Sequence, residues 1–305
     1  MPFAADLDPA RHLRPPRQLT HAKQYRIERL LGEGGMGLVY RAFDPILERS
    51  VALKMIKPDL PGAARRRFVR EARYGARLCH PNVVRVYDLG RLTTQGLDWF
   101  AMEYLVGRDL GDLLKRALRR DRTLPPRVVL TAFDRVLDAL THAHGRGLVH
   151  RDVKPANIFI TREQDGRRFG VKLLDFGVAL RIGDADDAHD LCGDPRYCPP
   201  EQILGTQPID ARADVYACGI AMFEALAGRH PFENALGEAP LSLVQAHREL
   251  EVPSLAPALA STWPEAVVRA LDALIRRATA KHADDRFASA DAMRMALREI
   301  PNAWA

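Results

Sequence analysis

The 305-residue sequence lacks several features that would assign it to a secreted, membrane or metal-bound class. Its four cysteines include no C-x-x-C pair and no histidine partner at metal-ligand spacing, so we expect reduced thiols. No apolar run approaches the roughly 18–20 residues needed to span a bilayer. Residues 1–16 contain Asp, Arg and Pro but no apolar signal core. We therefore expect a cytoplasmic chain, with a membrane anchor outside this sequence left open.

The overall composition is that of a soluble globular protein, with 47% hydrophobic and 28% charged residues. A chain of this length forms one large domain or two lobes that share a cleft. The net charge of +6 leaves nucleic acid or an anionic surface open as a partner. Solvated, arginine-rich helix faces are the commoner cause of such a charge, so no nucleic-acid partner is expected.

The pattern of apolar residues changes along the chain. Residues 1–23 are rich in Pro, Arg and Ala and are expected to form a flexible tail. The segment 214–226 is apolar almost all round, which predicts a buried central helix, and Asp165-Gly166 predicts a hairpin turn. The expected strands are 25–31, 38–43, 51–56, 83–89 and 99–102, and the expected helices are 63–78, 109–120, 127–146, 212–228, 240–249, 264–280 and 288–299.

Residues 32–39 read G-E-G-G-M-G-L-V and fit the pattern G-x-G-x-x-G-x-V. Glycines let the backbone fold tightly over phosphates and present its N–H groups to them. Dinucleotide-binding folds share the first six positions, but they need a helix immediately afterwards, whereas the flanks here favour strands. The candidate nucleotide-binding residues of this segment are Gly32, Glu33, Gly34, Gly35, Met36, Gly37 and Val39.

Residues 150–157 read H-R-D-V-K-P-A-N, and residues 175–177 read D-F-G. In this order they supply a carboxylate base, a cation, an amide and a second carboxylate, which a phosphoryl-transfer site needs. The two strings resemble the catalytic and metal-binding loops of protein kinases. The string H-P-N-V-V at 80–84 resembles the bacterial, Hanks-type serine/threonine branch. A buried polar network without chemistry is the alternative.

The resemblance implies an α+β, bilobal protein-kinase-like fold. In that fold a small antiparallel sheet with one main helix precedes a larger, mostly helical lobe. The expected parts are a tail at 1–23, a kinase domain at 24–299 with an N-lobe at 24–102, a hinge at 103–108 and a C-lobe at 109–299, and a second tail at 300–305.

The resemblance also assigns roles on the catalytic side. Asp152 would be the base or orienter for the substrate hydroxyl, and Lys154 would stabilise charge on the transferring phosphate. Asn157 and Asp175 would hold magnesium, whose preference for oxygen suits them, with manganese as the other candidate metal. A lysine two positions after the base is the form seen in serine/threonine kinases.

Two structural contacts are implied in the same lobe. Asp214 is expected to anchor the backbone of the catalytic loop. Glu201, in the P-P-E string at 199–201, is expected to pair with Arg286.

On the nucleotide side, residues 51–54 read V-A-L-K and resemble the kinase strand whose lysine binds the α- and β-phosphates. That residue is Lys54, in an apolar strand where an unpaired ammonium would be costly. Glu71 is the only acidic residue between Asp59 and Asp88 and is expected to pair with it. By the same resemblance the backbone at Glu103 and Leu105 would meet the adenine, Asp109 would reach the ribose, and Val39, Ala52 and Phe159 would enclose the base.

The activation segment at 175–201 departs from the family pattern. Kinases usually order it with a phosphothreonine that pairs with the arginine before the catalytic aspartate. Here Tyr197 carries the only hydroxyl in the segment. Asp190 aligns with the missing threonine, so it is expected to offer Arg151 a fixed negative charge. A solvated acidic loop is the equal alternative.

Asp194 aligns with a second threonine, which normally bonds to the catalytic Asp and Lys. A carboxylate at this position would repel Asp152, unless it pairs with Lys154 or the loop places it elsewhere. This position is the main argument for low activity.

The function expected is transfer of the γ-phosphoryl of Mg-ATP to Ser/Thr hydroxyls of proteins. One alternative is a weakly active or pseudokinase scaffold that binds nucleotide and protein partners. Another is a kinase-fold enzyme for a small molecule, against which the peptide-docking appearance of 193–201 counts. A homodimer is compatible with the family by analogy only.

Overall fold

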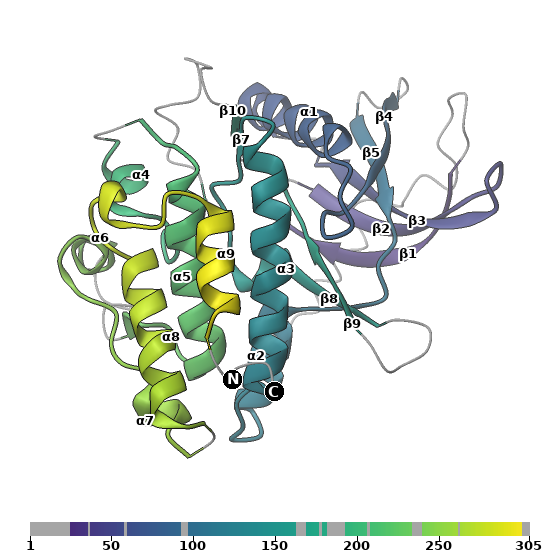
Figure 1. Cartoon of the computed structure of the whole chain (residues 1–305). Coiled ribbons are helices and arrows are strands. Elements are labelled where there is room, and N and C mark those ends of the chain that lie inside the picture. The colour runs from purple at the N-terminus through teal and green to yellow at the C-terminus, as the bar shows by residue number, and fades with distance from the viewer. Residues whose placement is uncertain are drawn as a thin grey trace, which may run out of the picture. The chain divides into compact units, whose positions relative to one another are not determined.

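The computed structural model describes residues 25–35, 37–57, 60–92, 97–162, 169–176, 179–181, 193–205, 208–233, 240–261 and 263–300. The chain divides into two compact units. The first unit comprises the described residues within 25–69 and 86–105, and the second comprises 70–85 and the described residues from 106 onward (Figure 1).

The first unit is built on a five-stranded antiparallel sheet with the order β1-β2-β3-β5-β4. Helix α1 begins in this unit, where Phe68 packs against Phe100 of the sheet with ring centroids 5.1 Å apart. The strands and the helix are β1 (Arg26–Glu33), β2 (Gly37–Asp44), β3 (Arg49–Ile56), β4 (Val86–Leu92), β5 (Leu97–Glu103) and α1 (Gly62–Arg77).

The prediction of a strand at 83–89 is wrong in its first residues. The strand begins at Val86, because Val83 and Val84 lie beside Leu173 of the second unit instead. The Val84 amide donates to the Leu173 carbonyl at 3.1 Å. An apolar run shows that these valines are buried, but it does not show which backbone they pair with.

The second unit is mostly helical. Its longest helices, α3 and α5, pack against each other and against α9, and α5 also packs against α8, around one hydrophobic core. The helices are α2 (Leu110–Leu118), α3 (Pro126–His144), α4 (Pro200–Leu204), α5 (Arg212–Ala227), α6 (Pro240–Glu249), α7 (Ala256–Leu259), α8 (Glu265–Ala278) and α9 (Ala290–Arg298), with 3-10 turns at Pro155–Asn157 and Ala283–Asp285.

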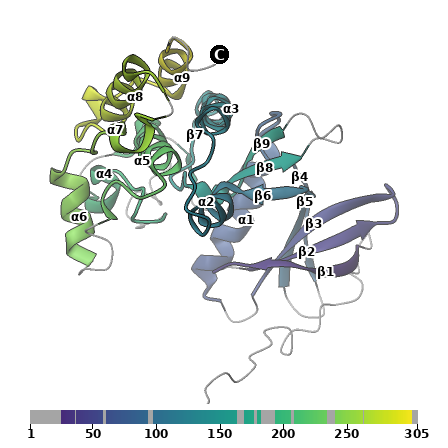
Figure 2. The same ribbon diagram turned by 90° about the horizontal axis from the view of Figure 1, so that it is seen from below.

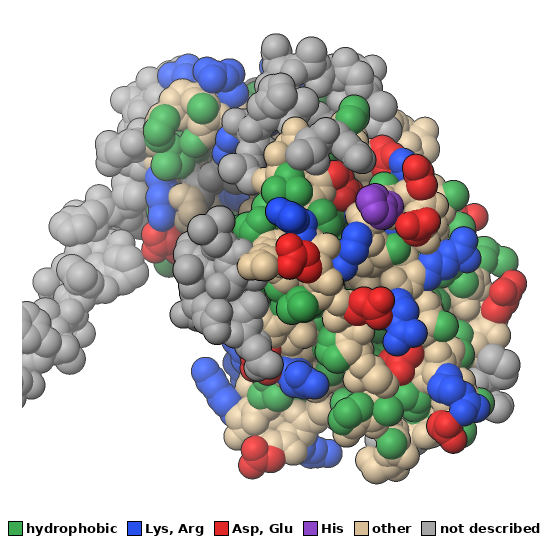
Figure 3. Space-filling model, turned by 90° about the vertical axis from the view of Figure 1, so that its left-hand side faces the viewer, with side chains coloured by type: hydrophobic (Ala, Val, Ile, Leu, Met, Phe, Trp, Pro, Cys, Tyr) green, Lys and Arg blue, Asp and Glu red, His purple; other side chains and the backbone are tan. Residues whose placement is uncertain are grey.

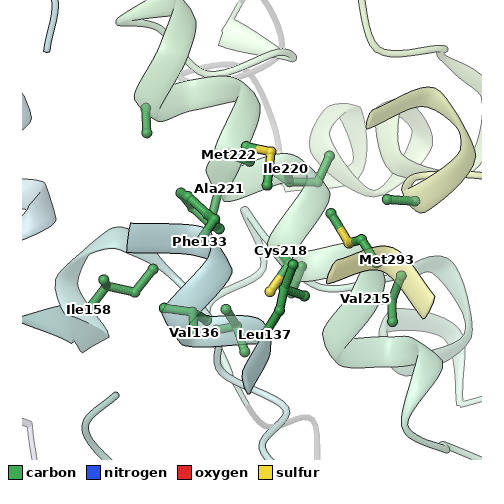
Figure 4. Close-up of a cluster of buried hydrophobic side chains, with 14 of the residues drawn as sticks. Phe133, Val136, Leu137, Ile158, Val215, Cys218, Ile220, Ala221, Met222 and Met293 are labelled. Atoms are coloured by element: carbon green, nitrogen blue, oxygen red, sulfur yellow. The ribbon is translucent and has the colours of Figure 1, made fainter. Parts of the chain in front are cut away.

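Helix α5 lies at the centre of this unit, as its composition predicted. Nearly all of its side chains are buried, including the carboxylate of Asp214 in its first turn. Figure 4 shows the apolar residues of α5, among them Cys218 and Met222, facing Phe133 of α3 and Met293 of α9. A helix that is apolar on all sides needs partners on all sides, and α3, α8 and α9 supply them.

Short strands complete the second unit beside α2 and α3 (Figure 2). A three-stranded antiparallel sheet has the order β6-β8-β9, and the pairing of β8 with β9 confirms the predicted hairpin. Its turn, with Asp165 and Gly166, lies outside the described residues. The strands are β6 (Gly107–Asp109), β8 (Ile158–Arg162) and β9 (Phe169–Leu173), and a two-stranded sheet joins β7 (Leu148–Val149) to β10 (Leu180–Arg181).

The described helices include none that is both long and apolar enough to cross a membrane. Figure 3 shows one face of the molecule, where acidic and basic side chains intermingle over the described surface. On that face the net charge of +6 is therefore not gathered into a single basic field.

Candidate active site

The predicted catalytic loop connects β7 to β8 in the second unit, and its centre is the carboxylate of Asp152. The Lys154 Nζ atom lies 3.0 Å from its Oδ1 and 2.8 Å from its Oδ2. The Asn157 Nδ2 atom donates to Oδ2 at 3.0 Å and to the Asp152 carbonyl at 2.8 Å. The Asp194 amide donates to Oδ1 at 2.9 Å. Donors on both oxygens hold this carboxylate in one orientation.

Asp214 anchors the backbone of the loop, as predicted. Its Oδ1 accepts from the Arg151 amide at 2.8 Å, and its Oδ2 accepts from the His150 amide at 2.8 Å and from His144 Nε2 at 2.7 Å. Burial by itself would raise the pKa of Asp214, but the His144 and backbone hydrogen bonds outweigh it and lower the pKa. These bonds hold Arg151 at a φ of 63°, in the left-handed region.

His150 ties the catalytic loop to the segment after β9. Its Nε2 donates to the Leu174 carbonyl at 2.9 Å, and its ring packs edge-on against Phe176 with centroids 4.7 Å apart. The Leu174 amide donates to the Asn157 carbonyl at 2.9 Å. These contacts bring the two predicted metal ligands, Asn157 and Asp175, onto adjoining segments.

The chemistry of these two residues fits a magnesium ion. The Asn157 Nδ2 group is used by Asp152, which leaves the side-chain oxygen as its ligand atom. Asp175 adds a half-buried carboxylate, held at a left-handed φ of 59°. Within the described part of the chain, no group of three or more His, Cys, Asp or Glu residues can hold a metal. An amide and a carboxylate completed by phosphate oxygens is the kind of set that magnesium uses.

The glycine-rich segment in the first unit is flanked by strands, as predicted, with β1 ending at Glu33 and β2 beginning at Gly37. The Gly34 amide donates to the Gly37 carbonyl at 2.8 Å and so closes the turn. A Cβ at Gly37 would overlap the carbonyl oxygen of Met55 on β3. Because β2 follows the glycines directly, a dinucleotide-type arrangement, which needs a helix there, is excluded. Gly32 and Gly35 lie in the described part of this segment, and Met36 lies outside it.

Three predicted nucleotide-binding residues share one face of the first unit's sheet. Val39 of β2 lies directly opposite Lys54 of β3, and Ala52 is two positions from Lys54 on the same strand. The Lys54 Nζ atom is 5.6 Å from the ring centroid of Phe100, its neighbour on β5. Strand alternation places these side chains on one side of the sheet.

The remaining predicted nucleotide-binding residues are divided between the units. Glu103 ends β5 and Leu105 follows it in the first unit. In the second unit Asp109 lies opposite Phe159 across β6 and β8. The Asp109 Oδ1 atom accepts from the Asp112 amide at 2.8 Å and so caps α2. Glu71 is buried but belongs to the second unit, so its pairing with Lys54 of the first stays a prediction.

Comparison with known proteins decides the family. The family model for the protein kinase domain matches residues 25–297. The chain belongs to the protein kinase family. Serine/threonine-protein kinase PksC of Streptomyces coelicolor is 38% identical over 279 residues, which cover 89% of this chain and 48% of the relative. PrkC of Bacillus subtilis is 35% identical, with 88% of this chain and 39% of the relative covered.

Solved structures agree with this family. The kinase domain of PknI from Mycobacterium tuberculosis matches with a TM-score of 0.68 and 32% identity, over 92% of this chain and 97% of that one. The predicted bilobal kinase fold and the resemblance to bacterial serine/threonine kinases are both confirmed. This kinase chain spans about half the length, or less, of the curated relatives named above.

At the end of the kinase's activation segment, the Asp194 carboxylate does not face Asp152, although the sequence suggested that it would. The backbone amide of Asp194 faces Asp152, while its carboxylate pairs with Arg196, with Arg196 Nη2 2.6 Å from Oδ2. Burial would raise the pKa of Asp194, but the Arg196 guanidinium outweighs it and lowers the pKa. Like-charge repulsion of Asp152 is therefore relieved by Arg196 and not mainly by Lys154. Asp190 lies outside the described residues.

Several residues near the kinase's catalytic loop received no role from the sequence. Gln202 Nε2 donates to the Arg151 carbonyl at 3.0 Å. The Tyr197 hydroxyl donates to Glu224 Oε2 at 2.6 Å, where burial and Asp194 favour the protonated carboxyl and raise the pKa of Glu224. The sequence gives no local signal for these long-range contacts. For the neighbouring pair of Asp194 and Arg196 it does give one, because a spacing of two residues suits a local turn.

The predicted pair of Glu201 and Arg286 is present in the structure. Arg286 Nη1 lies 2.6 Å from Oε1 and Nη2 lies 2.8 Å from Oε2, so the guanidinium binds the carboxylate through two parallel bonds. Both side chains are almost fully buried. The pair fixes the end of the activation segment to the loop before α9.

Proposed function

We propose that the chain is a serine/threonine protein kinase that transfers the γ-phosphoryl of Mg-ATP to Ser/Thr hydroxyls of proteins. The observation that carries this proposal is the arrangement of Lys154 and Asn157 on the carboxylate of Asp152. A bare structural network would not need an amide and a second carboxylate, Asp175, on adjoining segments. The curated relatives are named as serine/threonine-protein kinases, which supports the same activity here.

The described residues suggest how the chain would act. Asp152 orients the substrate hydroxyl and accepts its proton, because its carboxylate is held in one orientation and is still reachable. Lys154 has a side chain that is 21% exposed, so it can leave one carboxylate oxygen and meet the transferring phosphate. Asn157 and Asp175 would hold magnesium, which neutralises charge on the phosphates when bound. Manganese has the same ligand preference and is the second candidate.

Residues of both units would supply the nucleotide contacts. The backbone amides of the glycine-rich turn would face the phosphates, and Lys54 would bind them with Glu71 as its partner. The backbone at Glu103 and Leu105 would meet the adenine, with Asp109 at the ribose. Val39, Ala52 and Phe159 would enclose the base.

The proposal extends to regulation, cellular location and partners. We propose that Asp190 substitutes for a phosphothreonine opposite Arg151, so that activity does not depend on phosphorylation of the activation segment. ATP and reduced cysteines suit the cytoplasm. The expected protein partners are substrates with Ser or Thr, and a homodimer is a subordinate proposal.

The pseudokinase alternative has little in its favour. It depended on repulsion between Asp194 and Asp152, and Arg196 neutralises the first of these carboxylates. The curated relatives are named as serine/threonine-protein kinases.

The deciding experiment is transfer of radiolabelled γ-phosphate to a generic basic protein. Asp152→Asn keeps the shape of the side chain and removes the base, so it should reduce transfer by about 10²-fold or more. Phosphoamino-acid analysis should then find phosphoserine or phosphothreonine. Equal transfer by the wild type and Asp152→Asn would overturn the proposed function.

A further inference from the structure

The end of the activation segment forms a compact turn around Asp194. The Arg196 amide donates to Asp194 Oδ1 at 3.2 Å, and Arg196 Nε donates to the same oxygen at 3.0 Å. The Tyr197 amide and the Cys198 thiol donate to the Asp194 carbonyl at 3.0 Å and 3.2 Å. The side chain and the carbonyl of Asp194 are therefore both held within its own turn.

This leaves the amide of Asp194 as the group that reaches the catalytic loop. It donates to Asp152 Oδ1 at 2.9 Å. The approach is close at Gly193, whose φ is 98° and where a Cβ would lie 2.5 Å from the Arg151 carbonyl oxygen. A side chain at 193 would push the turn away from the loop, so this contact depends on glycine.

The turn is also fixed from behind. His230 Nε2 donates to the Arg196 carbonyl at 2.8 Å, and the Arg196 guanidinium lies 5.5 Å from the ring centroid of Tyr197. Tyr197 in turn is bonded to Glu224 of α5. Arg196 is therefore held at its backbone and its side chain, and it can restrain the carboxylate that it pairs with.

We infer that the ion pair of Asp194 and Arg196 is a positioning clamp for the catalytic base. Arg196 turns the Asp194 carboxylate away from Asp152 and neutralises it, and the restrained turn then aims the Asp194 amide at Asp152 Oδ1. Because Arg196 neutralises the carboxylate, an aspartate can occupy position 194 without repelling Asp152. The inference rests on the proposed function for its kinetic consequences.

The first test is a double-mutant cycle on kcat. Arg196→Met frees the Asp194 carboxylate and should lower kcat roughly tenfold, with little change in the KM for ATP. In the Asp194→Thr background there is no carboxylate to restrain, so Arg196→Met should lower kcat no more than about twofold. Equal losses in the two backgrounds would show that Arg196 acts independently of Asp194.

The second test is rescue by a conservative variant, which a merely structural role would not show. Arg196→Lys keeps a positive charge where Arg196 Nη2 lies 2.6 Å from Asp194 Oδ2, so it should retain more of kcat than Arg196→Met. Equal losses in the two variants would sink the inference.

The chain contains a matched control for loss of an Asp-x-Arg pair. Arg212 binds Asp210 two residues earlier, with Nη2 2.7 Å from Oδ2 and its amide 2.8 Å from Oδ1, but this pair does not contact Asp152. Arg212→Met should leave kcat within about twofold of the wild-type value. A loss of kcat in this control comparable to that of Arg196→Met would attribute the effect to general loosening, and the clamp would be rejected.

Hydrogen exchange separates failure of the clamp from failure of the proposed function. The Asp194 amide should exchange at least about tenfold faster in Arg196→Met than in wild type, and it should be unaffected by Arg212→Met. This readout needs no turnover. If the wild type transfers no phosphate but the exchange result holds, the clamp stands and the activity fails; unchanged exchange overturns the clamp in an active kinase.

Discussion

The buried carboxylate of Asp214 accepts hydrogen bonds from the backbone amide of Arg151 through one oxygen and from that of His150 through the other. The first turn of the central helix, α5, thus fixes the backbone path of the catalytic loop. The residue that carries out the proposed chemistry, Asp152, follows directly in the chain.

Asp214→Asn should therefore destabilise the protein and disturb the loop together. The amide presents an N–H group where the backbone donors need an acceptor, and buried unsatisfied donors are costly. We expect a loss of about 3–5 kcal/mol in the free energy of unfolding, measured by urea denaturation. Asp272→Asn is the control, because Asp272 also accepts a backbone amide, that of Leu255 at 2.7 Å, but at a half-buried site. A loss for Asp214→Asn no larger than that of the control would contradict the anchoring role.

Arg286→Met should also be strongly destabilising, because it leaves the Glu201 carboxylate buried without its partner. The expected loss is about 3–5 kcal/mol. The exposed pair of Arg269 and Glu265, with side chains 68% and 80% exposed, provides the comparison. Arg269→Met should cost less than about 1 kcal/mol. Similar unfolding midpoints for the two variants would show that the buried pair contributes no more than a surface one.

Acid should weaken the fold through His247. Burial lowers the pKa of His247 to about 3, whereas the unfolded chain has the ordinary value of 6.5. Between these values the unfolded state binds a proton that the folded state does not, so stability falls as the pH drops from about 6.5 towards 3. The contribution is about 1.4 kcal/mol per pH unit at most.

The measurement is urea unfolding at several pH values in that window. His247→Asn preserves an acceptor for the Tyr216 hydroxyl, which lies 2.8 Å from His247 Nδ1, and it should flatten the pH dependence. His282→Asn, at an exposed position, is the matched control and should leave the slope unchanged. A slope retained in His247→Asn would exclude His247 as its source.

Asp190→Asn should lower phosphotransfer several-fold if this carboxylate stands in for a phosphate opposite Arg151, since the amide has a similar shape but no charge. Asp187→Asn removes one negative charge from the same stretch of sequence and should have little effect. Initial rates at saturating ATP compare the two. Equal effects would favour the solvated acidic loop that was the alternative interpretation.

Much of the architecture could be predicted from local patterns. Strand alternation and helical periodicity located the main elements to within a few residues, and the all-round apolar character of 214–226 identified the central helix. The short elements β6, β7, β10, α4 and α7 were not predicted, because a few residues carry no period. Their positions depend on tertiary contacts instead, as the pairing of β6 with β8 shows.

The candidate site divides in the same way. Residue identity and order were enough to nominate Asp152, Lys154 and Asn157, since the chemistry needs those groups. They were not enough to orient Asp194, where alignment to a threonine suggested a side chain facing the base. In the structure the backbone amide of Asp194 faces Asp152, and its carboxylate faces Arg196 instead. The sequence alone does not show which of these two groups points towards the base.

The left-handed backbone at Arg151 and Asp175 has a consequence for how this protein can change. Non-glycine residues in that region carry a conformational cost of about 1 kcal/mol or more each. Glycine would relieve it at either position, but it would delete the guanidinium or the carboxylate that the proposed chemistry uses. At Arg151 the lost packing of a residue that is only 3% exposed would offset this relief. Substitutions that raise thermal stability therefore have to be sought away from these two positions.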